Sequence, residues 1–500
     1  MFGAAASTLD LADGSAWLAL STLFVLQLAL TLLLLSLVAL VSVRLAKAVG
    51  MLLFVVNAAA LYFIHTYGVL IDKTMVGNVF NTDPAEAWGL FHVKLLLYVA
   101  VLGVLPALAI AATRVRRPGI VKQLAFTLSV AVAGAGWLYA NSASWLWIDK
   151  HASRLGSLVL PWSYVINAAR YQSALANASR EQVPLPAATH VDDSDVIVVL
   201  VIGESARAKN FSLYGYGRST NPELAAAGAV PLANTTSCAT YTTESLQCML
   251  SSLGSKTPFS DSHEPLPSYV QRNGVDVTWR ANNSGEPRMK VGRFEIAPAI
   301  RKTCTGDCSR LQYDDVLLYG LDAQLREAGS RKKLFVLHQT GSHGPQYFNR
   351  YPPRFETFTP VCRTVEQSKC TTQELVNAYD NTIRYTDHFL ASVVALLKAQ
   401  GTPAVMLYVS DHGESLGEHG LYLHGTPMAL APDEQKDVPF IVWMSDSFAQ
   451  RKGVQAAVLR AQPAHSHDFV FHSVMGALGM AGPAYDRSLD IFSPATKASP

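Results

Sequence analysis

Four long stretches near the start of the chain contain no charged residue at all. They are Trp17–Val43, Ala48–Ile71, Leu95–Thr113 and Gln123–Ile148. A helix needs about 20 mostly apolar residues to cross a bilayer, and each stretch approaches or exceeds that length. Four such runs in succession disfavour the alternative of buried helices in a soluble protein. We therefore predict a transmembrane domain over residues 1–150, with helices at about 17–43, 48–71, 92–113 and 123–148 and a loop at 72–91.

Positive charge between these stretches predicts their orientation. Arg44 and Lys47 lie between the first and second, and four basic residues lie between positions 114 and 122. The N-terminal tail holds Asp10 and Asp13 but no basic residue, so it does not resemble a cleaved signal peptide. The positive-inside rule places the basic loops in the cytoplasm. The loop at 72–91 and everything after residue 149 are then outside.

The next segment connects the membrane part to the rest of the chain. Residues 151–180 place Trp162, Tyr164 and Tyr171 among small and polar residues. This pattern is equally typical of a helix at the membrane interface and of a plain linker helix. Residues 181–195 are rich in proline and aspartate, which is typical of a linker. We therefore predict an interfacial or linker region over 151–195.

Short apolar runs rich in β-branched residues mark the part from residue 196 onward. They are Val196–Ile202, Leu334–Leu337, Val405–Val409 and Phe440–Met444, and helical patterns such as Glu374–Lys398 separate them. Continuous apolar runs indicate strands buried on both faces. Strands alternating with helices predict an α/β domain over 196–500, with a mainly parallel central sheet flanked by helices. Ligands in such folds bind beyond the carboxyl ends of the strands.

Composition and cysteine spacing agree with this division. Of the 500 residues, 50% are hydrophobic and only 16% are charged, with a net charge of +2. These values exclude a disordered or fibrous chain and disfavour nucleic acid as a partner. All the cysteines fall after residue 196, in three close pairs that indicate disulfides in an extracytoplasmic domain. Zinc binding is the alternative, and nearest-neighbour pairing is the simplest of several connectivities.

Polar clusters follow the predicted strands. They are Gly203–Arg207, Ser237–Cys248, Gly341–Pro345 and Ser410–Glu414, the last followed by His424. Glu204, Asp411 and His412 offer the mixed oxygen and nitrogen ligands that suit catalytic Zn²⁺. A hydroxyl just before the predicted helix Thr243–Leu253 would lie near its positive end, which favours a phosphate. Alone, the first three clusters are more typical of caps, ion pairs or a structural histidine, and Asp411–Gly413 is as typical of metal binding as of a structural role. Four clusters on one sheet indicate a catalytic site.

Long motifs in these clusters resemble those of the bacterial inner-membrane phosphoethanolamine transferases, which include lipid A-modifying enzymes and mobile colistin-resistance proteins. The resemblance covers nearly the whole chain, and its carriers are GESARAKNFSLYGYGRSTNP, SCATYTTESLQCMLS, WRANNSG, LHQTGSHGPQYFNRYP and SDHGESLGEHGLYLHGTP. It implies an alkaline phosphatase/sulfatase-like catalytic domain. A true sulfatase is disfavoured, because TYTTES lacks the C/S-x-P-x-R motif that becomes formylglycine.

The resemblance also assigns roles to individual residues. Zinc ligands would be Glu204, Asp411, His412 and Thr242, which would also be the nucleophile. His343 and His424 would contact the substrate or a second zinc ion. The other residues that it implies are Asn283 and Ser284 on the acceptor side, Asn78, Thr82 and Glu86 near the lipid head group, and the disulfide pairs Cys238/Cys248, Cys304/Cys308 and Cys362/Cys370.

The implied reaction transfers phosphoethanolamine from phosphatidylethanolamine to lipopolysaccharide, most simply to a lipid A phosphate, through a covalent phosphoethanolamine–threonine intermediate. It would lower negative surface charge and so give resistance to polymyxins. Transfer to core heptose or Kdo, and a phosphoglycerol transferase of the same superfamily, are the alternatives. A non-catalytic scaffold is disfavoured, because the implied ligands and nucleophile are all present. The expected protein is a multi-pass monomer of the inner membrane with a periplasmic catalytic domain.

Three features depart from the family pattern. The stretch NNSGEPRMKVGR lacks two cysteines that many members have, and Pro287 stands where some have a substrate-contacting lysine. Arg288 and Lys290 are candidate replacements for that lysine. Family members have five spans, whereas four are predicted here. The hypothesis that follows is that translation begins upstream of Met1.

Overall fold

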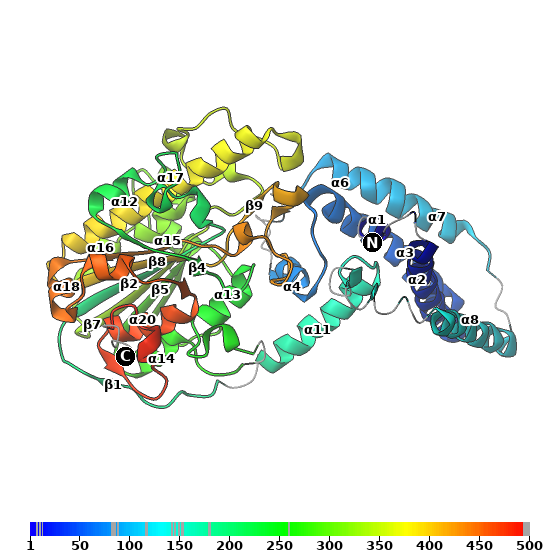
Figure 1. Cartoon of the computed structure of the whole chain (residues 1–500), viewed down its shortest axis with the longest axis horizontal. Helices are drawn as coiled ribbons and strands as arrows, with labels where there is room; N and C mark the ends of the chain where they lie inside the picture. Colours follow the sequence, from blue (N-terminus) through cyan, green and yellow to red (C-terminus); the bar gives the residue numbers. More distant parts are fainter. Residues whose placement is uncertain are drawn as a thin grey trace. The chain divides into compact units, whose positions relative to one another are not determined.

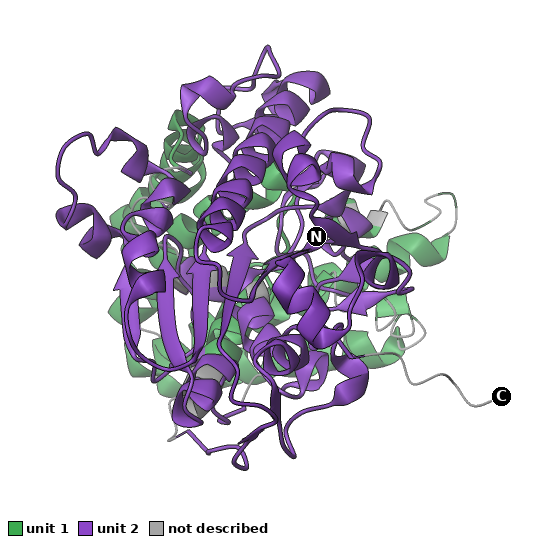
Figure 2. Cartoon of the chain, turned by 90° about the vertical axis from the view of Figure 1, so that its left-hand side faces the viewer, with its two compact units in different colours: residues 1–76, 91–171 green, residues 77–90, 172–500 purple. Residues whose placement is uncertain are grey.

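The computed structural model describes residues 1–6, 9, 12, 14–81, 87, 90–115, 119–141, 144, 147–148, 151, 155–178, 182–258 and 261–493. The chain divides into two compact units, residues 1–76 with 91–171 and residues 77–90 with 172–500 (Figure 2). Each unit is described separately below.

The first unit is helical. It contains α1 (Phe2–Ala6), α2 (Gly14–Val41), α3 (Val43–Tyr67), a continuous segment of α6 (Val93–Tyr98), η1 (Val99–Val104) and α7 (Leu105–Ala112), and α8 (Ile120–Ala140). Four helices among the described residues are long and apolar enough to cross a membrane: 14–41, 43–67, 93–112 and 120–140. Their apolar side chains are largely exposed, as lipid contact requires. The prediction of a helical N-terminal part with four apolar helices is therefore confirmed.

Two further helices extend across the boundary between the units. The helix α4 (Lys73–Asn81) occupies much of the segment predicted as a loop at 72–91, and α11 (Trp162–Ala178) occupies the predicted connector. Within the first unit, the Asn167 side chain donates a hydrogen bond to the carbonyl of Ile71 at 3.0 Å. This bond ties α11 to the segment that follows the second apolar helix.

A seven-stranded sheet forms the centre of the second unit (Figure 1). Only β11 runs against the direction of the others, so the sheet is mixed but mainly parallel, as the sequence predicts. Its strands, in spatial order, are β3 (Val230–Leu232), β11 (Phe440–Met444), β8 (Ala404–Ser410), β2 (Val196–Gly203), β7 (Lys332–His338), β5 (Asp276–Ala281) and β6 (Arg293–Ile296).

Helices cover both faces of this sheet. Alternate residues of β2 separate two cores: Val198 and Leu200 pack on one side, Val199 and Val201 on the other. The first core includes residues from α13 (Thr242–Met249), α14 (Leu266–Arg272) and α20 (Asp468–Ala477). The second includes residues from α12 (Pro222–Ala227), α15 (Ala297–Lys302), α16 (Leu321–Arg326) and α17 (Thr372–Lys398). Figure 1 shows α17 on one side of the sheet and α20 on the other. Burial on both faces explains the unbroken apolar runs.

Three disulfides are present in the second unit. They join Cys238 to Cys248, Cys304 to Cys308 and Cys362 to Cys370, which is the nearest-neighbour pairing. The first closes a loop that includes the start of α13.

Candidate active site

The parallel pairing of β2 with β8 brings two of the polar clusters together. Gly203 and Ser410 are paired at the carboxyl ends of these strands, and the backbone N–H of Asp411 donates to the carbonyl of Gly203 at 3.0 Å. Glu204 therefore lies beside Asp411 and His412. We call these three residues the strand-end cluster; all three side chains are fully buried.

The geometry of the strand-end cluster fits a cation. His412 Nε2 lies 3.2 Å from Glu204 Oε1 and 3.3 Å from Asp411 Oδ2. Its Nδ1 is 2.8 Å from the carbonyl of Gly413, which can only accept, so Nδ1 carries a proton. In the neutral ring, Nε2 then turns a lone pair toward two carboxylates. Such an arrangement repels unless a positive charge lies between the three groups.

Unsatisfied atoms and electrostatics agree with a positive charge at this point, which a proton on Nε2 or a metal ion can supply. Within the described part of the chain, neither Asp411 Oδ2 nor His412 Nε2 has a hydrogen-bond partner. Burial lowers the pKa of His412, but the neighbouring carboxylates outweigh it and raise that pKa above its usual range. Burial and the charge of Glu204 raise the pKa of Asp411. One ligand atom from each residue lies within 4.8 Å of the other two. Carboxylate and imidazole donors of this kind suit Zn²⁺.

Thr242 lies directly against this cluster. Its hydroxyl donates to Glu204 Oε2 at 2.9 Å, and the Asn283 side chain donates to the same oxygen at 2.8 Å. The sequence predicts a helix from Thr243 to Leu253, with the nucleophile before it. The bounds differ: α13 begins at Thr242 itself, after the extended N-cap Tyr241, and it ends at Met249, four residues earlier than predicted. Thr242 thus lies in the first turn, at the positive end of the helix dipole, which favours an anion.

A tight turn places Asn283 and Ser284 next to Thr242. Gly285 has φ +92°, and a Cβ there would lie 3.2 Å from Thr243 Oγ1 and 3.6 Å from Thr242 Cγ2. A side chain is therefore disfavoured by both backbone conformation and space. The backbone N–H of Ser284 donates to Asn283 Oδ1 at 2.8 Å, which fixes the amide that contacts Glu204.

His343 and His424 come from loops after different strands and meet beside the cluster. The ring of His424 lies 4.2 Å from that of His412 and 5.3 Å from that of His343, centre to centre. His424 Nδ1 donates to Glu414 Oε2 at 2.7 Å, so its Nε2 bears the lone pair. Burial, reinforced by His412, lowers the pKa of His424. Ligand atoms of Glu204, His343 and His424 also fall within 4.8 Å of one another.

Sequence reasoning missed several residues that support this site. The Ser205 hydroxyl donates to Glu204 Oε1 at 2.6 Å from a left-handed backbone, φ 55°. The Tyr347 hydroxyl donates to Glu414 Oε1 at 2.6 Å and so anchors the carboxylate that orients His424. Ser205 and Glu414 lie inside clusters that the sequence singled out, whereas Tyr347 follows such a cluster and gave no separate signal.

Of the three residues expected near the lipid head group, only the backbone of Asn78 lies within the described part of the chain. Asn78 lies in α4, but its side chain lies outside the described residues, as do Thr82 and Glu86 entirely. The structure therefore brings together Glu204, Thr242, Asn283, His343, Asp411, His412 and His424, with Ser284 adjacent.

Comparison with known families agrees with this architecture. Residues 197–480 match the sulfatase family, and residues 28–175 match the family described as phosphoethanolamine transferase EptA/EptB. The first match spans the central sheet and its strand-end loops. The second begins inside α2 and spans the other three apolar helices and most of α11.

Individual relatives match along most of the chain. Phosphoethanolamine transferase EptA of Helicobacter pylori is 38% identical over 458 residues, which covers 90% of this chain and 86% of the relative. Phosphatidylethanolamine transferase Mcr-1 of Escherichia coli is 36% identical, covering 79% and 78%. The structure of lipooligosaccharide phosphoethanolamine transferase A of Neisseria meningitidis superposes with a TM-score of 0.86 at 31% identity, covering 96% and 92%. The chain therefore belongs to the phosphoethanolamine transferases of the alkaline phosphatase/sulfatase superfamily.

Proposed function

We propose that this enzyme transfers phosphoethanolamine from phosphatidylethanolamine to lipopolysaccharide, with a lipid A phosphate as the acceptor and Thr242 as the nucleophile. The observation that carries this proposal is the Thr242 hydroxyl, bonded to Glu204 at 2.9 Å beside a buried cluster that requires a cation. The four apolar helices support an enzyme of the inner membrane whose catalytic domain, residues 196–500, faces the periplasm. One chain supplies all these side chains, which supports a monomer.

Glu204, Asp411 and His412, with the Thr242 oxygen, would hold one Zn²⁺; His343 and His424, with Glu204, would hold a second where one binds. When bound, zinc supplies positive charge that lowers the pKa of a ligated hydroxyl and neutralises phosphoryl oxygens. The residues present fit this role because Asp411 Oδ2 and His412 Nε2, both possible metal ligands, have no hydrogen-bond partner among the described residues, and because the cluster holds two carboxylates.

In the first half-reaction, a bond forms between Thr242 Oγ1 and the phosphorus of phosphatidylethanolamine, and the bond from phosphorus to the diacylglycerol oxygen breaks. The threonine proton passes to Glu204 Oε2, its hydrogen-bond acceptor. The leaving oxygen takes a proton from His343, because Nε2 of the neighbouring His424 bears a lone pair. Asn283 holds Glu204 Oε2 in place during this step.

In the second half-reaction, an oxygen of the lipid A phosphate bonds to the same phosphorus and the bond to Thr242 breaks. Thr242 recovers its proton from Glu204, and His343 is reprotonated from water. Separation into two displacements predicts ping-pong kinetics. The added ammonium group offsets negative charge on the outer surface, so cationic peptides such as polymyxins bind less well.

Mass spectrometry of lipid A tests the proposal. A polymyxin-sensitive strain is compared with and without the wild-type protein and the Thr242→Ala variant, with equal membrane levels confirmed by immunoblot. The expected result is a phosphoethanolamine mass gain on lipid A and polymyxin resistance, both lost in the variant. A gain on core sugars alone contradicts the acceptor, a phosphoglycerol mass contradicts the donor, and a gain with Thr242→Ala contradicts the nucleophile.

A further inference from the structure

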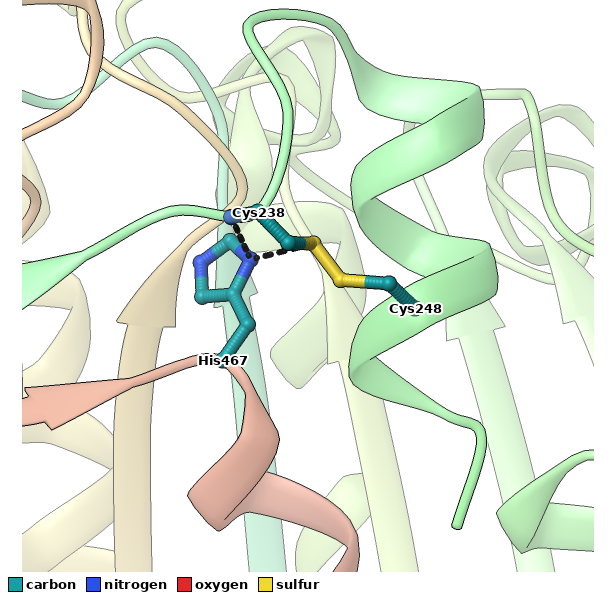
Figure 3. A group of neighbouring side chains, drawn as sticks. All are labelled: Cys238, Cys248 and His467. Carbon is teal, nitrogen blue, oxygen red and sulfur yellow. Dashed lines mark hydrogen bonds between the residues drawn. A yellow bond between two sulfur atoms is a disulfide. The ribbon is translucent and has the colours of Figure 1, made fainter. Parts of the chain in front are cut away.

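Another buried histidine, His467, lies near the active site, and within the described part of the chain it makes no hydrogen bond to Thr242 or to the side chains of the strand-end cluster. His467 is the N-cap of α20 and follows β12 (His465–Ser466), which pairs in parallel with β4 (Thr235–Thr236). Its side chain is fully buried beside the Cys238–Cys248 disulfide (Figure 3). Because both sulfur atoms are bonded to each other, this group offers no thiolate to a metal.

Both ring nitrogens of His467 are used. Nε2 lies 2.9 Å from the carbonyl of Ser410, which can only accept, so Nε2 carries the proton and donates. Nδ1 therefore has a lone pair, and it accepts the backbone N–H of Cys238 at 3.3 Å. Cys238 Sγ also lies 3.3 Å from Nδ1. The imidazole thus bridges two backbone segments that are far apart in the sequence.

The bond from the Cys238 N–H to His467 Nδ1 holds the loop that leads to Thr242. Cys238 opens the short segment that leads to Thr242, and its disulfide to Cys248 fastens that segment to α13. The Ser237 hydroxyl bonds to the carbonyl of Ala239 at 2.7 Å, which further fixes the loop. A shift of Cys238 therefore moves the helix N-terminus that carries Thr242.

The bond from His467 Nε2 to the Ser410 carbonyl holds the strand end that precedes Asp411. Ser410 directly precedes Asp411, and its hydroxyl accepts the backbone N–H of Ala206 at 2.8 Å. Ala206 lies two residues after Glu204. Ser410 is therefore a junction between the β2 and β8 strand ends, and its carbonyl is the atom that His467 holds.

We propose that His467 is a positioning residue for phosphoryl transfer, holding the Thr242 loop in register with the strand ends that carry Glu204 and Asp411. This inference rests on the proposed role of Thr242 as nucleophile. Displacement of a reacting atom by about 1 Å can cost about a hundredfold in rate. Residues that orient ligands from behind typically contribute ten- to a hundredfold.

The bridging tautomer is stable across physiological pH. Burial lowers the pKa of His467 to about 4, with the carbonyl of Ser410, Asp468 and His412 as the other groups that act on it. A second proton on Nδ1 would point at the N–H of Cys238, so two hydrogen-bond donors would face each other and that hydrogen bond would be lost. His467 therefore stays neutral and bridges as a fixed element.

Two variants separate the two ends of the bridge. In His467→Asn the amide oxygen replaces Nδ1 and keeps the bond to Cys238, but the donor to Ser410 is lost. In His467→Gln the amide nitrogen replaces Nε2 and keeps the bond to Ser410, but the acceptor for Cys238 is lost. His467→Ala removes both. The matched control is His472→Asn: His472 is another buried histidine of α20, and its Nδ1 accepts the N–H of Asp486, away from the site.

The full-length proteins in detergent are mixed with phosphatidylethanolamine, and the phosphoethanolamine adduct on Thr242 is followed by peptide mass spectrometry. We expect adduct formation about tenfold slower in each single-bond variant and about a hundredfold slower in His467→Ala, with zinc content, free-thiol content and KM for phosphatidylethanolamine unchanged. We expect His472→Asn to keep the wild-type rate per folded molecule, even where its unfolding temperature falls.

The role of His467 would be overturned if its variants formed the adduct at the wild-type rate. It would also be overturned if their rates fell only as far as that of His472→Asn at the same loss of thermal stability. If His467→Ala does not fold, His467→Asn and His467→Gln still test the proposal, because each loses only one of the two hydrogen bonds. A wild-type enzyme that forms no adduct on Thr242 refutes the proposed nucleophile, and the positioning role with it. A normal wild-type adduct with unaffected variants refutes the positioning role alone.

Discussion

Two buried carboxylate clusters in the second unit differ in whether their polar atoms have hydrogen-bond partners. Around Asp380 of α17, Oδ1 accepts from the Asn210 amide at 2.6 Å, and Oδ2 accepts from the Tyr216 hydroxyl at 2.9 Å and Arg218 Nη1 at 2.8 Å. We call these four residues the Asp380 cluster. In the strand-end cluster, by contrast, one carboxylate oxygen and one imidazole nitrogen have no partner among the described residues.

The difference distinguishes a structural cluster from one built for a ligand. A buried polar group without a partner costs about 1–3 kcal/mol, so a fold keeps such groups where something else satisfies them. Arg218 already supplies the positive charge that Asp380 needs. The strand-end cluster has only His412 to offset two carboxylates, and a metal ion satisfies all three groups at once. Burial alone, which both clusters share, does not identify the active site.

The largest contrast is expected from the same substitution in both clusters. Asp411→Asn keeps an oxygen for the N–H groups of Ser205 and His412 but removes the charge at Oδ2. We expect it to lose zinc and to lower transfer activity at least about a thousandfold, because the cation supplies several kcal/mol of transition-state stabilisation. Metal analysis and a transfer assay on the purified proteins measure both quantities.

Asp380→Asn is the control for that substitution. It removes the same charge from a cluster that makes no contact with the reacting groups. We expect full zinc content and activity within about fivefold of wild type. A comparable loss of activity in both variants would show that hydrogen-bond satisfaction does not separate the two clusters.

Metal removal sharpens the comparison through stability. A ligand that binds only the folded state stabilises it by about 4 kcal/mol at a thousand times its dissociation constant. We expect chelation to lower the unfolding temperature of the wild-type protein and restored zinc to raise it again. Asp411→Asn should respond to neither treatment, while Asp380→Asn should respond as wild type does. A chelator effect of equal size in Asp411→Asn would place the stabilising ion elsewhere.

The strand-end cluster was predictable from sequence for a physical reason. Unbroken apolar runs fix strands buried on both faces, and parallel neighbours bring the residues that follow them to one edge. Glu204 and Asp411 are therefore placed together by β2 and β8 alone, and the structure sets their side chains against His412. The alkaline phosphatase/sulfatase-like fold implied by the motifs is likewise confirmed.

The remaining features depend on contacts that no local pattern reveals. The strands β5 and β6 carry alternating or charged residues and lack the apolar runs that mark β2 and β8. His467 is 57 positions from Ser410 and 229 from Cys238, so its bridge depends on tertiary packing alone. The start of α13 at Thr242 depends on the extended backbone of Tyr241, which propensity does not encode. Local sequence thus identified reactive groups better than the residues that position them.

A smaller effect is expected when the Asp380 cluster itself is dismantled. Asp380→Ala leaves the Asn210 amide without its acceptor in the interior and leaves Arg218 without its ion pair. We expect a loss of about 3 kcal/mol in the free energy of unfolding, because breaking a buried pair costs about that much. Chemical denaturation measures it, and zinc content should stay at the wild-type value. An unchanged stability would show that the Asp380 cluster contributes specificity of packing rather than free energy.

The smallest expected effect concerns Asp490, a buried carboxylate that accepts hydrogen bonds from neutral donors, with Lys452 and Arg487 acting on it through their charge. Its Oδ2 accepts from the Tyr485 hydroxyl at 2.7 Å and its Oδ1 from the backbone N–H of Phe492 at 2.9 Å. Burial raises the pKa of Asp490 to about 6, from 3.8. The folded state therefore binds this proton more tightly than the unfolded chain does. The resulting stability is full below about pH 4 and is lost as pH rises from about 4 to 6, a change of about 2 kcal/mol.

Asp490→Asn cannot ionise, so we expect it to remove that part of the fall in stability between about pH 4 and 6. Urea unfolding of both proteins at several pH values measures the difference, which cancels the titration of every other group. A pH dependence identical to that of wild type would mean that the two neutral donors stabilise the Asp490 carboxylate as well as water does. In that case two neutral donors, with the charges of Lys452 and Arg487, suffice for a buried carboxylate. The need for a cation in the strand-end cluster would then come from its second carboxylate rather than from burial.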